Sequence, residues 1–158
     1  MNVTILCVGK LKQAWEKEAC GEYLKRLTRY GRFEVIEVDD CPEPTKPSAA
    51  LDKQVLDREG ALLLRQIRPT DRVVALCIDA RTYDSPGLSA QLSQWAMQGQ
   101  RIILVIGGSL GLSEDVLRRA DERLSFSKLT FPHPLMRVIL LEQVYRACKI
   151  AKGERYHK

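Results

Sequence analysis

The chain has 158 residues, of which 45% are hydrophobic and 28% charged, as expected for a single globular domain, residues 1–158, with its own core. No apolar run approaches the roughly 18 residues of a membrane-spanning helix, and "MNVTILCVGK" lacks the basic segment and cleavage site of a signal peptide. The five cysteines are scattered and form no CxxC pair. This argues against a metal site or a disulfide framework, and it favours reduced thiols in a cytoplasmic protein.

The net charge of +5 is unevenly distributed along the chain. Residues 118–158 hold ten Lys or Arg and four Asp or Glu, whereas residues 1–117 hold fifteen and sixteen. A basic C-terminal quarter would attract an anionic partner, above all nucleic acid. The alternative is a solvated basic tail that only improves solubility.

Apolar, β-branched runs alternate with helical patterns along the chain. The runs predict strands at 3–8, 33–38, 72–78 and 101–106. Helices are predicted at 14–30, at 49–67, from the cap Ser85 to about Met97, and after the cap Ser113. Strands that alternate with helices predict an α/β domain with a mostly parallel sheet. The Pro-rich stretch at 39–50 is interpreted as a surface loop.

Two of the predicted helices carry an apolar stripe that should face the sheet. In the first helix the stripe residues lie four apart, at Trp15, Ala19, Tyr23 and Leu27. In the second helix the inner face is expected to comprise Leu51, Val55, Leu56, Leu62, Leu63 and Ile67.

A glycine-rich turn, "IGGSLGLSED", joins the fourth strand to the helix after it. Glycine lets a ligand or another backbone segment approach closely, and ligands of open α/β sheets bind at the carboxyl ends of the strands. The turn is neither GxGxxG nor a P-loop. A plain strand-to-helix turn and a site for an adenosine-containing cofactor without a phosphate cradle both remain open.

The stretch "LSFSKLTFPHPLMRVILLEQVYRACKI" is unusual for a domain of this class. A strand-like run breaks at Pro-His-Pro, and the helix that follows is apolar on nearly every face although it carries Arg137 and Glu142. The two prolines favour a sharp turn. A helix buried on two sides suits packing between its own sheet and a partner subunit, and a central core helix of a monomer is the alternative.

Taken in order, "VVALCID", "LVIGGSLGL", "LSFSKLTFPHPLMRVILLEQVYRA" and the terminal "GERYHK" resemble a family of small SPOUT-type methyltransferases. The resemblance covers essentially the whole chain. It implies a mostly parallel sheet flanked by helices with a C-terminal trefoil knot, a homodimer, and methylation of N3 of a pseudouridine in 23S rRNA. The implied methyl donor is S-adenosylmethionine. Because the domain is small and carries no separate RNA-binding module, we expect it to bind 23S rRNA within the assembled ribosome.

The resemblance also implies which residues hold the methyl donor, largely through backbone groups of three loops. These are Leu76, Gly107 and the segment Phe126, Ser127, Lys128, Leu129, Thr130 and Phe131. Leu76 and Leu129 would sandwich the adenine. Without the resemblance, Leu76 and Phe126 would be interpreted as ordinary core residues.

Candidates for the chemistry are His133, Arg137, Tyr156 and His157. Uracil-type N3–H is weakly acidic, so a general base or a group that stabilises the developing anion would help. Each candidate has a structural alternative. His133 could bond backbone at the turn, Glu142 and Arg146 could form only a helical ion pair, and the tail could be frayed.

Basic residues could form a phosphate-contacting face, namely Arg118, Arg119, Arg123, Lys128, Arg137, Lys149, Lys152, Arg155 and Lys158. Competing functions are a non-enzymatic RNA- or ribosome-binding factor, a Rossmann-like methyltransferase and a nucleotide-dependent dehydrogenase. The single glycine in "LCVGKLK" disfavours the Rossmann-like enzyme, and the missing dinucleotide fingerprint disfavours the dehydrogenase.

Overall fold

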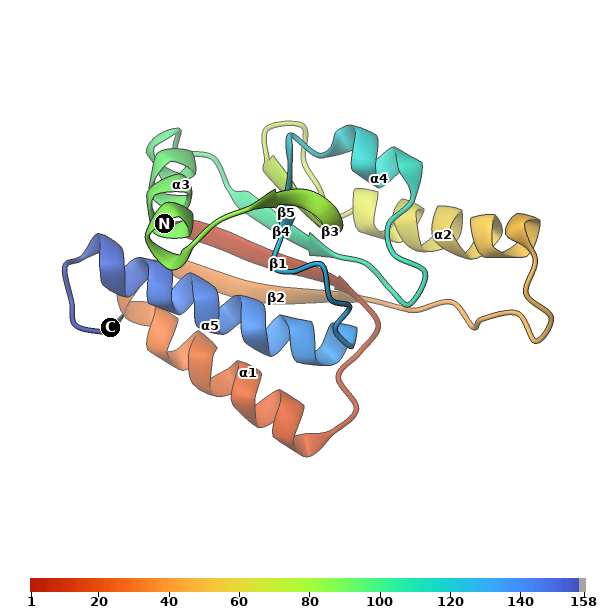
Figure 1. Ribbon diagram of the computed structural model, residues 1–158, viewed down its shortest axis with the longest axis horizontal. Coiled ribbons are helices and arrows are strands. Elements are labelled where there is room, and N and C mark those ends of the chain that lie inside the picture. Colours follow the sequence, from red (N-terminus) through yellow and green to blue (C-terminus); the bar gives the residue numbers. More distant parts are fainter. Residues whose placement is uncertain (157–158) are drawn as a thin grey trace.

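The computed structural model describes residues 1–156, which form a parallel sheet between two layers of helices (Figure 1). The strands are β1 (Asn2–Val8), β2 (Arg32–Val38), β3 (Arg72–Thr82), β4 (Ile102–Ile106) and β5 (Glu122–Ser125). Helices are α1 (Ala14–Leu27), the short 3-10 turn η1 (Thr28–Tyr30), α2 (Ala49–Leu64), α3 (Ser85–Met97), α4 (Glu114–Arg119) and α5 (His133–Ala151). In the described residues no helix is both long and apolar enough to cross a membrane.

The sheet order is β2-β1-β4-β3-β5, and every neighbouring pair is parallel. This confirms the predicted α/β class and the four predicted strands. Successive side chains of a strand point to opposite faces, and the central strands use both. Val3, Ile5 and Cys7 of β1 join one core cluster, whereas Leu6 and Val8 join the other.

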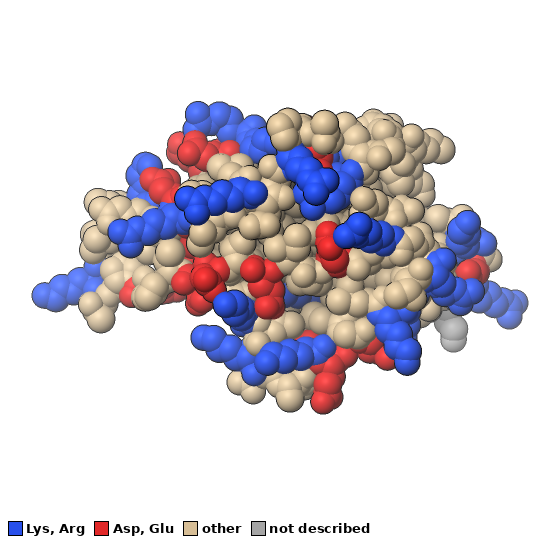
Figure 2. All heavy atoms as spheres, turned by 180° about the vertical axis from the view of Figure 1, so that it is seen from behind, with Lys and Arg blue, Asp and Glu red and all other residues tan. Residues whose placement is uncertain are grey.

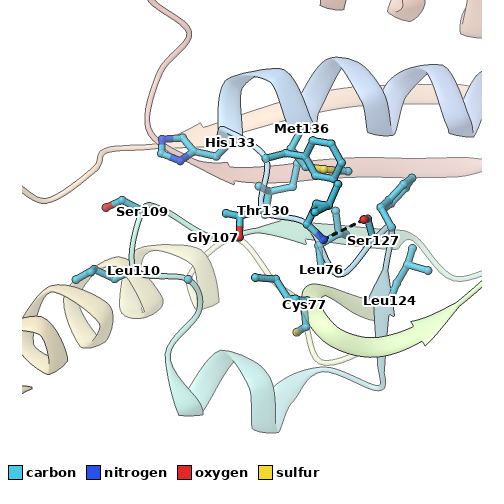
Figure 3. A pocket seen from close by; sticks show the side chains of 17 residues that line it. Leu76, Cys77, Gly107, Ser109, Leu110, Leu124, Ser127, Thr130, His133 and Met136 are labelled. Carbon is cyan, nitrogen blue, oxygen red and sulfur yellow. Dashed lines mark hydrogen bonds between the residues drawn. The ribbon is translucent and has the colours of Figure 1, made fainter.

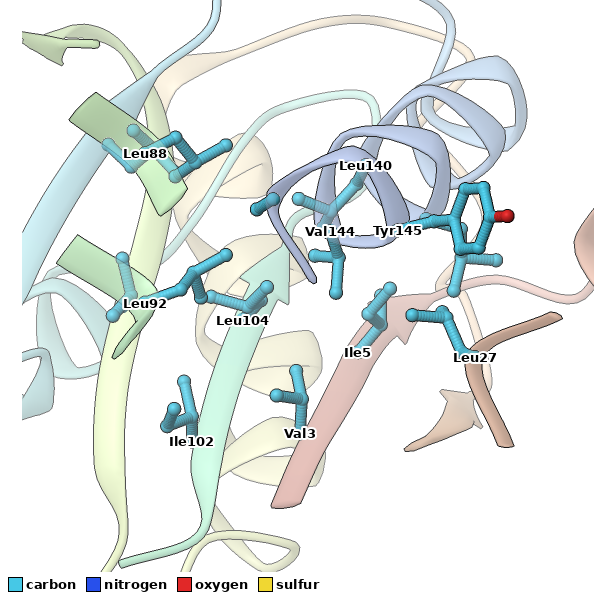
Figure 4. Packing of buried hydrophobic residues seen from close by; sticks show 14 of the residues in the cluster. Val3, Ile5, Leu27, Leu88, Leu92, Ile102, Leu104, Leu140, Val144 and Tyr145 are labelled. Atoms are coloured by element: carbon cyan, nitrogen blue, oxygen red, sulfur yellow. The ribbon is translucent and has the colours of Figure 1, made fainter. Parts of the chain in front are cut away.

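The two core clusters show which helices cover which face. The larger cluster combines one face of the sheet with side chains of α1, α3 and α5, including Leu27, Leu92 and Val144 (Figure 4). The smaller cluster combines the other face with Leu63 of α2 and Val116 of α4. Burial on both faces explains why the strands are almost continuously apolar.

The predicted inner faces of α1 and α2 are partly wrong. Trp15 is 53% exposed and Leu51 is 40% exposed. On α1 the buried positions are Glu16, Cys20 and Leu27, and Glu16 is held there because its Oε2 accepts a hydrogen bond from Gln13 N at 3.1 Å in a capping box. Leu51 lies in the first turn of α2, where that helix extends beyond the sheet (Figure 1).

Capping residues begin three of the helices. Ser113 caps α4 as predicted, because its Oγ accepts from Val116 N. The cap of α3 is Asp84 and not Ser85, since the Asp84 carboxylate accepts from Gly87 N at 2.7 Å. Ser48 caps α2 in the same way. An N-cap of this kind stabilises a helix by about 1 kcal/mol.

Helix α5 accounts for the apolar stretch after Pro-His-Pro within a single chain. It packs against α1 on one side and α3 on the other, and its inner face lies on the sheet (Figures 1 and 4). No position from 133 to 150 is exposed. The apolar composition of α5 is therefore explained within one chain. From the sequence alone, that composition had favoured a partner subunit.

The strand-like run before Pro-His-Pro is shorter than its sequence suggests. β5 ends at Ser125, and the chain is irregular until His133. Ser125 Oγ lies 2.7 Å from Ile78 O and 3.1 Å from Ser127 O, while Ser127 Oγ accepts from Leu129 N at 3.0 Å. Such side-chain bonds to nearby backbone compete with strand pairing.

Candidate functional site

A pocket of about 300 Å³ opens at the carboxyl edge of β3, β4 and β5 (Figure 3). This is the edge at which ligands of open α/β sheets bind. Its walls come from the middle of β3 at Leu76, where the pairing with β5 shifts register, the turn after β4, the segment after β5, and the first turn of α5. The lining residues are Leu76, Cys77, Ile78, Ile106, Gly107, Gly108, Ser109, Leu110, Gly111, Leu124, Phe126, Ser127, Leu129, Thr130, Phe131, His133 and Met136.

The glycine turn after β4 is held together by its own packing. A Cβ on Gly107 would lie 2.2 Å from Gly111 O, and Gly111 has a φ of +92°. The turn closes where Gly111 N donates to Gly108 O at 3.0 Å. These two glycines are therefore required by the turn itself, which gives the pocket a wall with a defined shape.

The opposite wall is the segment 126–131, of which all residues except Lys128 line the pocket. Leu129 is 71% exposed at the rim. Of the amides of residues 128–131, only that of Leu129 has a hydrogen-bond partner among the described residues. This wall thus combines apolar side chains with backbone groups that are free to bond a ligand.

His133 begins α5 and lines the pocket with Met136 (Figure 3). Burial lowers the pKa of the imidazole below its ordinary value of 6.5, and the positive charge of Arg137 lowers it further, while Asp40 and Glu16 act in the opposite direction. At neutral pH the imidazole is consequently uncharged and can accept a proton or a hydrogen bond.

Arg137 does not line the pocket but is fully buried behind it. Its Nη1 lies 2.5 Å from Glu37 Oε1, and its Nη2 donates to Val8 O at 2.8 Å and to Gly9 O at 2.6 Å. These partners are two buried backbone carbonyls and one half-buried carboxylate of the protein itself. The prediction that Arg137 holds a phosphate or a developing oxyanion therefore finds no support in its position.

Tyr156 lies against α5, away from the pocket of its own chain. Its hydroxyl donates to Glu142 Oε1 at 3.1 Å, its ring packs edge-on against Tyr145, and the Arg146 guanidinium lies 4.7 Å from the ring centroid. Burial and the Glu142 carboxylate raise the pKa of Tyr156 to about 12. The tail is docked as far as this residue, and His157 lies outside the described residues.

Glu142 and Arg146 form the helical ion pair that their spacing indicated, with 2.6 Å between Arg146 Nη2 and Glu142 Oε1. Because Tyr156 shares the same carboxylate oxygen, this pair also serves to hold the tail.

The sequence reasoning missed several lining residues, chiefly Cys77, Ile78, Ile106, Leu124 and Met136. Four of them lie within two residues of a predicted site residue: Cys77 and Ile78 follow Leu76 within β3, and Ile106 and Leu124 lie near the ends of β4 and β5. Met136 lies three residues after His133, on the same side of the helix. These residues could have been predicted only because they are adjacent to the predicted binding loops. Taken alone, each apolar residue would be interpreted as an ordinary core residue.

The predicted basic face is interrupted by internal ion pairs. Arg118 pairs with Asp115 and Lys149 with Glu154, and Arg119 donates to the carbonyls of residues 68 and 71. Arg123, Lys128, Lys152 and Arg155 are exposed. Figure 2 shows acidic side chains interspersed among the basic ones on the reverse face. The charge excess is therefore a scattered feature of the described surface.

The chain matches, over residues 1–157, the family described as "Predicted SPOUT methyltransferase". It is 50% identical to the "Ribosomal RNA large subunit methyltransferase H" of Bifidobacterium animalis subsp. lactis (strain AD011) over 159 residues, with 100% of both chains covered. The proteins of the same name from Listeria welshimeri and Desulfitobacterium hafniense are 48% and 46% identical, with 100% of this chain and 100% and 99% of theirs covered.

A solved structure described as that of a methylase family protein from Neisseria gonorrhoeae has a similar fold. Its TM-score is 0.52 at 14% identity, with 91% of this chain and 81% of that chain covered. At this identity the likeness concerns the fold alone. The full-length sequence matches carry the assignment, and they agree with a pocket at the carboxyl edge: the chain belongs to the SPOUT methyltransferases and, within them, to the family of the ribosomal RNA large subunit methyltransferase H proteins.

Proposed function

We propose that this protein methylates N3 of a pseudouridine in 23S rRNA of the large ribosomal subunit, with S-adenosylmethionine as methyl donor. Relatives that match it from end to end carry the name of a large-subunit rRNA methyltransferase. The observation that carries the proposal is the pocket, because one cavity gathers every predicted donor-binding residue except Lys128.

The chemistry of the pocket walls fits such a donor. Leu76 and Leu129 both line the cavity and offer apolar surface for an adenine ring. The unbonded amides of Lys128, Thr130 and Phe131 offer donors for polar edges. When bound, the donor supplies an electrophilic methyl group on a sulfonium. The chain itself has to orient the target and exclude water, because alignment provides most of the gain in a displacement.

His133 is the candidate to accept or share the N3 proton. It lines the pocket, and its lowered pKa leaves the imidazole neutral at pH 7. A neutral imidazole within reach of a weakly acidic N–H can act as a general base or orient it by a hydrogen bond. Tyr156 and His157 would have to act from the tail.

We also propose that the C-terminal region is knotted, because a knot would hold together the loops that form the donor pocket. Leu124 pairs with Leu76 and again with Arg81, so residues 77–80 of β3 bulge out of the ladder with β5. Ser125 Oγ donates to Ile78 O in this bulge. The bulged segment is where we propose that the chain is threaded before α5.

A homodimer is supported by apolar surface beside the pocket. Ile78 is 47% exposed and Leu129 is 71% exposed, and both line the cavity. A second copy that covered this rim would bury apolar area worth about 25 cal/mol per Å². It would also bring a second tail near the pocket, which the tail of the same chain does not reach as far as it is described.

Two measurements test the proposal. Isothermal titration with S-adenosylmethionine should show saturable binding, and mass spectrometry of large-subunit rRNA from cells with and without the protein should show one methylated pseudouridine that depends on it. Binding of rRNA without any binding of the donor would instead favour the non-enzymatic RNA-binding factor.

A truncated chain that lacks residues 155–158 sharpens the test. It should lose methylation but keep donor affinity and the dimer, because Tyr156 does not line the donor pocket. The Glu142→Gln variant, which weakens the docking of Tyr156 together with the ion pair to Arg146, should show a smaller loss. Full activity in the truncated chain would remove the tail from the mechanism.

A further inference from the structure

Arg137 is the fully buried charged side chain of a helix that is otherwise apolar on its inner face. A guanidinium taken out of water is costly unless its donors are satisfied. Its two terminal nitrogens are bonded to Glu37, Val8 O and Gly9 O. The parts of the fold that these bonds connect follow from where the three acceptors lie.

All three acceptors lie at the carboxyl end of the sheet, next to the pocket edge. Val8 is the last residue of β1, and Glu37 is the penultimate residue of β2. Gly9 has a φ of +80°, and its N–H donates to Val38 O at 2.8 Å. Its carbonyl accepts a hydrogen bond from Arg137. Glu37 Oε1 also accepts from Leu11 N at 3.1 Å. The bonds therefore tie the ends of two strands and the loop after β1 to one arginine.

Arg137 belongs to the same part of α5 as two pocket residues. It follows Met136 and lies one turn after His133, and both of these line the cavity. The start of α5 has no side-chain cap, because its N-cap residue is Pro132. The segment before it forms few hydrogen bonds. Packing against α1, α3 and the sheet holds α5 as a whole. At its first turn, where no cap is present, the three bonds of Arg137 add a direct tie to the strand ends.

We infer that Arg137 and Glu37 are a positioning pair, which holds the first turn of α5 so that His133 and Met136 form the pocket wall. The pair acts through these two residues and touches no ligand itself. The assignment rests on the proposed function only for the identity of the ligand, since the anchoring of the pocket wall is a property of the chain alone.

The chain contains a matched control at the opposite edge of the sheet. Arg101 precedes β4 at its amino end, and its guanidinium bonds Asp71 Oδ2 at 2.6 Å, Asp71 Oδ1 at 3.1 Å and Gln66 O at 2.9 Å. It is likewise a largely buried arginine held by one carboxylate and backbone carbonyl. Its loss should affect stability in a similar way without reaching the pocket.

The experiment compares Arg137→Lys with Arg101→Lys. Lysine keeps the charge but cannot reproduce the planar fork. Hydrogen–deuterium exchange, read well below the melting temperature of each variant, should be about tenfold faster for the first hydrogen-bonded amides of α5, residues 136–140, in Arg137→Lys than in Arg101→Lys. The Kd for S-adenosylmethionine should rise roughly tenfold or more in Arg137→Lys only, as expected when a pocket wall shifts.

The possible outcomes separate the pair from the proposed function. If both variants melt lower but exchange at 136–140 is the same in both, Arg137 is a stabilising core residue and the inference is overturned. If the wild type does not bind S-adenosylmethionine, the proposed function fails, and the exchange comparison still decides the inference. Should Arg137→Lys not fold, Glu37→Gln leaves the carbonyl acceptors in place, and faster exchange at 136–140 is again expected.

Discussion

The two walls of the pocket are built on different physical grounds. The turn from Gly107 to Gly111 packs against itself so tightly that a Cβ on Gly107 would lie 2.2 Å from Gly111 O. The segment 126–132 across the cavity has few hydrogen bonds and an exposed Leu129. One wall is thus rigid by its own sterics, and the other depends on what anchors its two ends, namely β5 and the first turn of α5.

This difference predicts that substitutions in the two walls will affect stability and ligand binding in different proportions. In the glycine turn the two should be lost together. In the segment after β5, ligand binding should weaken while the fold is retained.

The largest effect is expected for Gly107→Ala. The added methyl group would meet backbone atoms that cannot move aside, so the free energy of unfolding should fall by about 3 kcal/mol and the Kd for S-adenosylmethionine should rise about 100-fold. Urea denaturation and titration calorimetry measure the two quantities. Gly21→Ala is the matched control, since it lies inside α1 with nothing within 4 Å of the new Cβ, and it should stabilise the chain by about 0.5 kcal/mol. A stable Gly107→Ala that binds normally would contradict a rigid wall.

A smaller and more selective effect is expected for Leu129→Ala. Because Leu129 is 71% exposed, the free energy of unfolding should change by less than about 0.5 kcal/mol. The loss of apolar contact with the ligand should raise the Kd roughly tenfold. Met97→Ala removes a similarly exposed apolar side chain, 86% exposed, far from this cavity, and should change neither quantity. Equal Kd values for the two variants would remove Leu129 from the site.

The smallest effect concerns the pH dependence of stability. It should depend on His133, which lies where the segment 126–132 meets α5. Burial lowers the pKa of His133 below its ordinary 6.5, so the unfolded chain binds this proton more readily than the folded one. Stability should therefore decline as the pH falls through 6.5, and this decline should level off below the folded-state pKa. His133→Gln should lose part of the decline between pH 7.5 and pH 5.5, as measured by urea denaturation. His157 is present in both proteins, so its contribution cancels. An unchanged decline would show that His133 is not held in a desolvating position.

Much of the site was accessible from the sequence, but for unequal reasons. The glycine turn was predictable as a special position because clustered glycines after an apolar strand indicate a tight turn or a close approach that a side chain would block. Leu76 and Phe126 were assigned only through the family resemblance, because an apolar residue in a strand is usually core. Arg137 was a candidate to hold a phosphate or the developing oxyanion, and its partners in the fold could not be identified from neighbouring residues because Glu37 and Val8 lie far away in the sequence.

By itself the sequence determined the order of strands and helices, the parallel α/β class, the cap at Ser113 and the family. These follow from periodicity, from turn residues and from motifs, all of which act between residues close in the chain. Only the tertiary structure decided that α5 is enclosed by α1, α3 and the sheet within one chain. It alone also revealed that Arg137 pairs with Glu37, which lies 100 residues away in the sequence. The physical reason is that the burial of a charge is decided by the partners that the fold brings to it.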